Sequence, residues 1–403
     1  MLSERARVHL SEPSEIRAAF EKAAELSARF GDDQVHKLCI GNPEIPAPVE
    51  VQQAMAEALR EEEAAGGDTT PFHGYMCDAG FAETREAVAQ DLNTRFGTAY
   101  TQENVIMTAG AACALNIALS SLLDPGDEVV VFTPCYPAYR RFIENWGGRM
   151  VACPTSAPDF QPDPKAFEHV ITPRTKAVIV NSPNNPSGAI YSRETLKGLA
   201  SVLEDAQQRY GAPICLLSDE PYRELAFDGV EVPYTALFYR NTVTAYSFSK
   251  SLSLPGERIG YAVVPDEVEE APALRCAMRA SLGDLGFVNA PAFFQRVVAR
   301  CMDARIDVEA YAQSRATLVQ GLRKLGFRAD WPQGGFYLFL ETPIDEAEFL
   351  DRALAHRLVL VGGSAFGQPG FVRISFCLRH ESIEAALPAF EALAQELGLP
   401  GKT

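Results

Sequence analysis

Short apolar runs alternate with helical segments through the middle of this 403-residue chain, and this alternation restricts the fold more than any other feature. The runs lie at residues 104–108, 128–132, 176–181, 213–218 and 242–247, with helical patterns before and between them at 81–96, 111–123 and 193–210. Continuous apolar strands joined by helices are typical of a mostly parallel sheet that is covered on both faces. The sequence therefore predicts an α/β fold with such a sheet at its centre, flanked by helices.

The pattern changes after Pro291, and we expect a smaller α+β domain there. Helices are predicted at 292–304, 308–325, 345–356 and 382–397, with strands at 328–331, 336–341, 358–361 and 371–376. Near the start of the chain, residues 14–30 have the spacing of an amphipathic helix, and residues 38–40 form a predicted strand before a turn. We expect an N-terminal segment (1–45) that packs with the small domain or a partner subunit, a large cofactor-binding domain (46–290) and a small C-terminal domain (291–403).

Charge and cysteine content exclude several classes of protein. The net charge of −17 argues against a nucleic-acid partner, because such binding depends on clustered Lys and Arg. The nine cysteines are scattered and include no Cys-x-x-Cys pair, which favours a reducing cytoplasm and no metal site. No run approaches 18 apolar residues, and residues 1–10 lack an apolar core, so we expect neither a membrane span nor a signal peptide.

Polar or small residues follow four of the predicted strands where each strand ends. They are Gly110-Ala111-Ala112, then Asn185, then Asp219 with Tyr222, and finally Lys250 in Ser247-Phe248-Ser249-Lys250. Loops at the carboxyl ends of parallel strands open on one edge of the sheet, where ligands bind. We therefore expect these loops to meet in one pocket.

The residue types in these loops suit a pyridine aldehyde phosphate. The Lys250 amine can hold an aldehyde as an imine, and the Asp219 carboxylate can keep a pyridinium nitrogen protonated. Asn185 and Tyr222 can hydrogen-bond a phenolic oxygen, and Tyr136 offers a ring for stacking. A phosphate suits the start of a helix, together with hydroxyls and a guanidinium. The candidates for that group are Gly110, Ala111, Ala112, Ser247, Ser249 and Arg258.

Each of these residues also has an ordinary structural explanation. An Asp after a strand is commonly a helix cap, an Asn-Pro pair is usually a turn, and a single Lys is usually solvated. The joint occurrence after successive strands favours the functional interpretation. The rival Ser-x-x-Lys motif of penicillin-binding proteins requires Ser-Asp-Asn and Lys-Thr-Gly, and the sequence contains neither. Dinucleotide and P-loop glycine motifs are also absent.

Six motifs make the chain resemble the class I/II aminotransferases, which are pyridoxal-phosphate enzymes of fold type I. They are Gly41-Asn42-Pro43, His73-Gly74-Tyr75 and residues 181–188, 218–222, 247–261 and 371–375. The resemblance runs from about residue 16 to residue 397 and implies a large and a small domain. It also implies the reaction, which moves an amino group from an L-amino acid to a 2-oxo acid by a ping-pong mechanism through a Lys250 Schiff base.

The resemblance further implies roles for matching residues. Lys250, Asp219 and Tyr222 are the expected catalytic residues, and Arg373 is expected to grip the substrate α-carboxylate beside Asn185 and the Gly41 backbone. Pyridoxal 5′-phosphate is the expected cofactor, and its expected ligands are Gly110, Ala111, Ala112, Tyr136, Asn185, Asp219, Tyr222, Ser247, Ser249, Lys250, Arg258 and Tyr75. Tyr75 resembles a tyrosine that reaches the neighbouring subunit's phosphate, which implies a homodimer with shared active sites.

Other functions of the same fold stay open at this point. A C–S β-lyase would use the same cofactor groups, whereas a decarboxylase is disfavoured because Arg373 would hold the carboxylate. A cofactor-sensing transcription regulator needs a DNA-binding module, and only about 40 residues precede Gly41.

The amino donor also stays open. Dicarboxylate-specific members use a cation for the distal carboxylate, and the corresponding residues 281–287 contain Asp284 and no Arg. Arg17 and Arg140 are the candidates that remain for that role, and the ordinary alternative for each is a solvated side chain.

Overall fold

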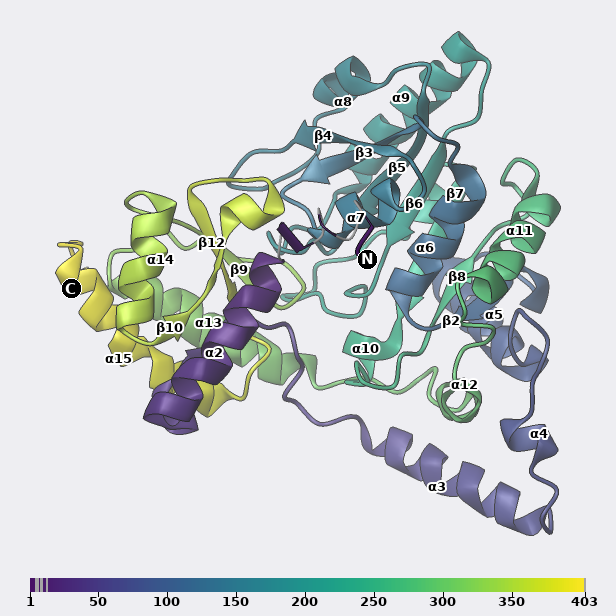
Figure 1. Cartoon of the computed structure of the whole chain (residues 1–403), viewed down its shortest axis with the longest axis horizontal. Helices are drawn as coiled ribbons and strands as arrows, with labels where there is room; N and C mark the ends of the chain where they lie inside the picture. The colour runs from purple at the N-terminus through teal and green to yellow at the C-terminus, as the bar shows by residue number, and fades with distance from the viewer. Residues whose placement is uncertain (4–6, 8–9, 12–13, 402–403) are drawn as a thin grey trace.

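The structure, a computed structural model, describes residues 1–3, 7, 10–11 and 14–401. Its main element is a seven-stranded sheet (Figure 1). In order across the sheet the strands are β2 (Val105–Thr108), β8 (Gly260–Val263), β7 (Thr242–Ser247), β6 (Cys215–Asp219), β5 (Thr175–Asn181), β3 (Glu128–Thr133) and β4 (Arg149–Pro154). β8 is antiparallel to both of its neighbours, and the other pairs are parallel. The predicted mostly parallel sheet is confirmed, and β4 and β8 are strands that the prediction missed.

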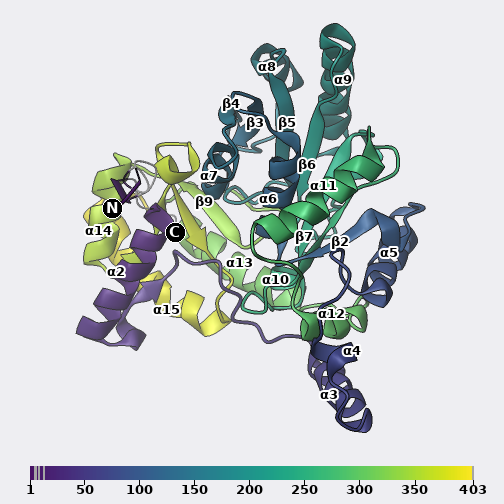
Figure 2. The same ribbon diagram turned by 45° about the vertical axis from the view of Figure 1, so that its right-hand side comes forward.

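Helices cover both faces of this sheet (Figures 1 and 2). In β3, Val129 and Val131 belong to one apolar core, while Val130 and Phe132 belong to another. Because successive strand residues point to opposite faces, both faces need apolar cover. The first core includes α6 (Ala111–Leu122), α7 (Ala138–Glu144) and α11 (Ala271–Asp284); on the second face lie α8 (Pro164–Val170), α9 (Arg193–Tyr210), α5 (Ala82–Phe96) and α12 (Ala292–Ala299).

Two helices, α3 (Val49–Ala64) and α4 (Thr70–His73), extend from one end of the molecule in both views (Figures 1 and 2). α12 packs against α3 and α5. The predicted division into domains at residue 291 stays a prediction, and α12, which follows it, packs with elements that precede it.

A separate apolar core, away from the large sheet, surrounds an antiparallel three-stranded sheet of order β11-β12-β9. Its elements are α13 (Val308–Lys324), β9 (Tyr337–Glu341), α14 (Glu346–Ala355), β11 (Val361–Gly362), β12 (Phe371–Ser375) and α15 (His380–Glu396). The N-terminal segment packs here, because β1 (His36–Lys37) pairs with β10 (Leu358–Val359) and α2 (Glu15–Phe30) contacts β10 and β11. Short 3-10 turns lie at Asp32–Gln34, Gln102–Asn104, Thr235–Leu237 and Gly363–Phe366.

Two predicted strands are wrong. Residues 328–331 form no strand, and the carbonyl of Ala329 accepts a hydrogen bond from the Arg323 side chain instead of a ladder partner. Residues 38–40 lie in a turn and coil after β1, where the Cys39 carbonyl accepts from Arg373. In both places an arginine side chain satisfies backbone that the apolar pattern assigned to a strand.

None of the helices in the described ranges is long and apolar enough to cross a lipid bilayer. Part of the stretch 1–10, in which we expected no signal peptide, lies outside the described residues.

Candidate active site

One cavity at the carboxyl ends of the parallel strands collects most of the predicted site residues. Its lining includes Gly41, Ala111, Ala112, Tyr136, Asn185, Asp219, Tyr222, Ser247, Ser249, Lys250, Arg258 and Arg373. Gly110 adjoins this lining, because a Cβ atom built on it would lie 2.7 Å from Nη2 of Arg258. The residues come from the loops after β2, β3, β5, β6 and β7 and from β12, so the cavity lies between the two sheets.

Lys250 lies in α10 (Phe248–Ser251), the single turn that follows β7. Its Nζ atom donates a hydrogen bond to the carbonyl oxygen of Gly41. Burial lowers the pKa of Lys250 to about 8, and the nearby guanidinium groups of Arg373 and Arg258 act in the same direction. A buried amine with this pKa is partly neutral near pH 7, and a neutral amine is a nucleophile and a base.

Asp219 ends β6 and is buried beneath the same cavity. The Tyr139 hydroxyl donates to its Oδ2 atom, while Oδ1 is buried and has no hydrogen-bond partner among the described residues. Burial raises the pKa of Asp219 to about 7. A buried carboxylate oxygen without a partner is destabilising, so Oδ1 marks a place for a ligand's cationic donor.

The opposite end of the cavity suits an anion. Arg258 Nη2 donates to the Ala109 carbonyl at 3.1 Å, which holds the guanidinium against the start of α6. The hydroxyls of Ser247 and Ser249 lie 2.7 Å apart beside it. The first N–H groups of a helix have no partner within the helix and attract phosphate. A guanidinium, two hydroxyls and a helix start therefore form a site for a dianion.

Arg373 reaches the cavity from the small sheet. Its Nη1 atom donates to Asn185 Oδ1 at 3.0 Å, and its Nη2 atom donates to the Cys39 carbonyl at 2.7 Å. The Nε atom is buried and has no partner among the described residues. The guanidinium lies 4.3 Å from the ring centroid of Tyr337. Its planar fork is thus fixed in place and has donor capacity left for a carboxylate.

Backbone carbonyls in the segment 39–41 accept hydrogen bonds from the side chains of both Arg373 and Lys250. Cys39 accepts from Arg373, and Gly41 accepts from Lys250. Residue 41 must be glycine, because a Cβ atom there would lie 1.9 Å from the Tyr337 hydroxyl.

Two tyrosines of this site were absent from the sequence-based prediction. Tyr139 holds Asp219, and the Tyr337 hydroxyl lies 3.1 Å from that of Tyr222. Tyr136 lies in the coil just before α7, and its ring packs edge-on against that of Tyr139, with the two ring centroids 5.6 Å apart. No local pattern marked either missed tyrosine: Tyr139 had only its closeness in the chain to Tyr136, and Tyr337 only its place in a predicted strand.

Three candidate residues lie outside the cavity. The Tyr75 side chain is 95% exposed, and its predicted role concerns a neighbouring copy, so it stays a prediction. Arg17 pairs with Glu21 at 3.4 Å and Arg140 with Glu144 at 2.8 Å, and both guanidinium groups are exposed. Neither arginine lines the cavity.

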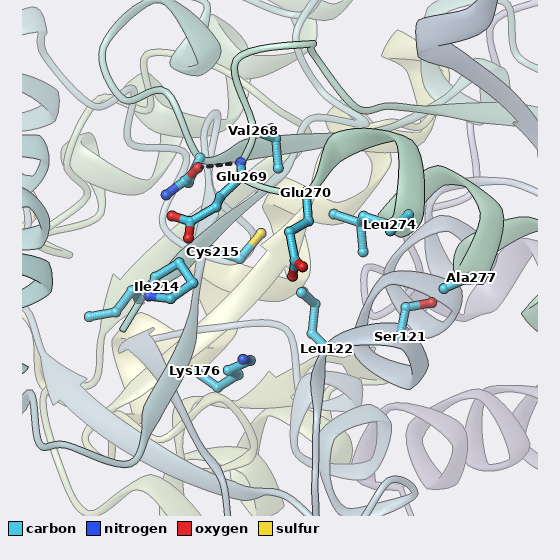
Figure 3. A pocket seen from close by; sticks show the side chains of 13 residues that line it. Ser121, Leu122, Lys176, Ile214, Cys215, Val268, Glu269, Glu270, Leu274 and Ala277 are labelled. Atoms are coloured by element: carbon cyan, nitrogen blue, oxygen red, sulfur yellow. Dashed lines mark hydrogen bonds between the residues drawn. The ribbon is translucent and has the colours of Figure 1, made fainter. Parts of the chain in front are cut away.

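A second cavity lies at the opposite edge of the large sheet, at the starts of β5 and β6 (Figure 3). Lys176, Cys215, Glu269 and Glu270 are part of its lining. None of the predicted site residues belongs to that lining. The groups with candidate chemistry therefore gather at the carboxyl edge.

Comparisons with known proteins agree with this geometry. A family model described as aminotransferase class I and II matches residues 33–390. The aspartate/prephenate aminotransferase of Thermus thermophilus is 35% identical over 390 residues, covering 95% of this chain and 97% of the relative. The arginine–pyruvate transaminase of Pseudomonas aeruginosa is 30% identical over 380 residues, covering 91% of each chain.

Solved structures give the same result. An amino transferase from Eubacterium rectale matches with a TM-score of 0.93 and 40% identity, covering 98% of this chain and 99% of the other. Aspartate aminotransferase from Thermus thermophilus with maleate matches with a TM-score of 0.86 and 31% identity over the same shares. The chain belongs to the class I and II aminotransferases, and it is a pyridoxal-phosphate-dependent enzyme that moves an amino group from an amino acid to a 2-oxo acid by a ping-pong mechanism.

Proposed function

We propose that Lys250 and Asp219 are the two main catalytic residues of this aminotransferase. The observation that carries the proposal is their burial in one cavity, where the pKa of Lys250 is lowered to about 8 and that of Asp219 is raised to about 7. Groups with perturbed pKa values in one cleft are candidates for acid–base chemistry. Arg373 is the proposed carboxylate-binding residue, since it is buried, fixed and directed into the same cavity.

The residues around the cavity fit pyridoxal phosphate. The unpartnered Oδ1 atom of Asp219 suits a pyridinium N–H, and the start of α6 with Arg258 suits the phosphate. Tyr222 and Asn185 offer polar atoms to the phenolic oxygen, and Tyr136 offers a ring face. When bound, the cofactor supplies an aldehyde that takes up amino groups and a ring that withdraws electrons.

The residues of the cavity then have separate roles. Arg373 binds the substrate α-carboxylate and orients the α-carbon, with Asn185 and the Gly41 backbone beside it. Lys250 Nζ takes the proton from the substrate α-carbon and would deliver it to the cofactor carbon that carries the nitrogen, and it reverses this transfer on the second substrate. Asp219 stays ionised against the positive ring nitrogen, and the Tyr139 hydroxyl helps to hold that charge.

We also propose that the enzyme is a homodimer with shared active sites in the cytoplasm. Tyr75, Phe287 and Val288 are exposed at 95%, 44% and 41%, and a hydrogen bond from Asn289 to the Cys77 carbonyl links their two segments. We call these three exposed apolar residues the exposed patch, because exposed apolar surface is typical of interfaces. All nine cysteines are free thiols, which supports a reducing compartment.

Lys250→Ala tests the proposal. Turnover should fall by roughly 1000-fold or more, because both the covalent attachment and the proton transfer are lost. The visible absorbance of the lysine-bound cofactor should also disappear. Lys176→Ala, which removes a lysine from the other cavity, is the matched control and should keep both.

Wild-type turnover in Lys250→Ala would show that another residue attaches the cofactor. Release of pyruvate and a thiol from cystathionine, without amino transfer, would instead point to the C–S β-lyase alternative.

A further inference from the structure

Transamination changes only the substrate carbon that carries the amino group, so the cavity must bind the rest of the molecule as it is. A dicarboxylic amino acid therefore brings two carboxylates into the cavity. Each carboxylate that enters a buried site needs a cation or several donors, because an unpaired buried charge is strongly destabilising. A second cation beside Arg373 is therefore the feature that distinguishes a site for aspartate or glutamate.

Three cationic side chains line the cavity within the described ranges, namely Lys250, Arg258 and Arg373. Arg258 is fixed at the phosphate end by the carbonyls of Ala109 and Pro255. Under the proposed function, Lys250 holds the cofactor and Arg373 holds the α-carboxylate. No cation lining the cavity then remains for a distal carboxylate.

Part of the cavity wall is apolar. Phe366 lies 4.8 Å from the Arg373 guanidinium, and Ile16 packs against the core cluster that contains Phe366. Ile16 also lines the cavity, as do Leu115, Tyr136 and Phe142. Ile16, Tyr136 and Phe142 are partly exposed, so an apolar substrate side chain can bury surface against them.

A second copy adds no cation through the exposed patch around Tyr75, Phe287 and Val288. The two segments that carry this patch, residues 68–81 and 281–291, contain no Lys or Arg. The histidine in the first segment, His73, is already paired with Glu62 at 2.9 Å.

We infer that this enzyme takes neutral amino acids with apolar side chains, aromatic ones included, and rejects aspartate and glutamate. The inference rests on the proposed function, because it assigns Arg373 and Lys250 to other tasks. Both halves of a ping-pong reaction use one site, so the same restriction applies to the 2-oxo acid. Ile16 and Phe142 are the residues that determine this specificity.

Single-turnover reactions of the holoenzyme with leucine, phenylalanine, aspartate and glutamate test the inference. The absorbance of the bound cofactor reports each half-reaction. Leucine or phenylalanine should react at least ~100-fold faster than aspartate at low concentration, the loss expected from one unpaired buried carboxylate. An advantage below tenfold would overturn the inference and leave the proposed function intact, whereas failure of every donor would overturn both.

Equilibrium binding gives a readout without turnover. By calorimetry, 4-methylpentanoate should bind the holoenzyme at least ~10-fold more tightly than succinate. Tighter binding of succinate would contradict the inference.

Phe142→Arg supplies the missing cation and should shift the aspartate-to-leucine rate ratio toward aspartate by at least ~10-fold, while Phe142→Leu should not. Ile16→Arg repeats the test from α2, which forms another part of the cavity wall. This second variant is needed in case α7 does not tolerate an arginine at position 142. An unchanged ratio in both arginine variants would overturn the assignment of these two walls.

Discussion

At the scale of single residues, burial disfavours the charged forms of both Lys250 and Asp219. It lowers the pKa of the amine to about 8 and raises that of the carboxyl to about 7. Without a ligand, each group is therefore only partly ionised near neutral pH. A positive ring nitrogen bound at Asp219, as proposed, would restore its ionised form, so the cofactor would compensate the burial of this carboxylate.

Asp219 gives a prediction for the cofactor-free protein. Its folded-state pKa lies above its ordinary value, so the folded protein gains stability from the protonated form below about pH 4 and loses it as the pH rises through 7. Asp219→Asn removes this dependence. From pH 4 to pH 7, the variant should gain thermal stability relative to wild type, as measured by the difference between their Tm values.

Asp228 provides a contrasting control. A hydrogen bond from Arg315 lowers the pKa of Asp228, so Asp228→Asn should lose stability relative to wild type above pH 4. If the Tm difference between wild type and Asp219→Asn is the same at every pH from 4 to 7, Asp219 is not buried as described.

The sequence indicated which residues the structure brings into one cavity and missed two residues that contact them. Lys250, Asp219 and Asn185 each come at or after the end of a predicted strand, so their order along the chain indicated that they would meet. Tyr139 and Tyr337 contact those residues only because α7 and β9 are placed beside them. Hydroxyl partners of this kind depend on tertiary packing, which no local pattern encodes.

At the scale of elements, the proposed anion site lies at the junction of β2 and α6. Gly110 has a φ of +83°, a left-handed conformation that favours glycine, and it lies against Arg258. Gly126 has a φ of +94° but no atom within 4 Å of a Cβ built there. A substitution at Gly126 therefore tests backbone strain alone, whereas a substitution at Gly110 adds crowding of the Arg258 guanidinium.

Gly110→Ala should weaken cofactor binding by roughly 10-fold or more, because the added methyl group displaces Arg258 from the helix start. Gly126→Ala should cost stability through its φ angle and leave cofactor affinity unchanged. Titration of the apoenzyme with cofactor, followed by absorbance, measures both. Equal affinity in the two variants would exclude Arg258 and the α6 start as the anion site.

The two missed strands are an edge strand with polar residues, β4, and a short strand, β8. β4 is an edge strand with exposed and half-buried positions at Arg149–Pro154. β8 has four residues, begins with Gly260 and follows the left-handed Arg258 closely. An edge position relaxes the demand for apolar residues on both faces, and a short antiparallel strand needs no helix before it.

At the scale of the whole molecule, the site exists only because two sheets meet. Arg373 and Asn185 are 188 positions apart in the chain and hydrogen-bonded in the structure. Their meeting was predictable through resemblance to a family, because no periodicity or spacing relates such distant positions. The predicted boundary at residue 291, by contrast, came from a change of pattern, and α12, which follows it, packs against α3 and α5, which precede it.

Mixing two inactive variants tests the shared-site dimer. Lys250→Ala lacks the lysine and Tyr75→Ala lacks the residue offered to the other subunit. A hybrid dimer then has one site with both residues intact. An equimolar mixture refolded together should regain about one quarter of wild-type activity, because half of the dimers are hybrids with one working site of two. Activity no greater than the mean of the two parents would show that Tyr75 serves its own subunit.

The carbonyls of residues 39–41 hold Arg373 and Lys250 at positions two residues apart. A shift of this short peptide would change both contacts together, so we expect binding of a carboxylate at Arg373 to alter the hydrogen bond of the Lys250 amine as well. An insertion between these two carbonyls should then remove that link while leaving each side chain in the cavity.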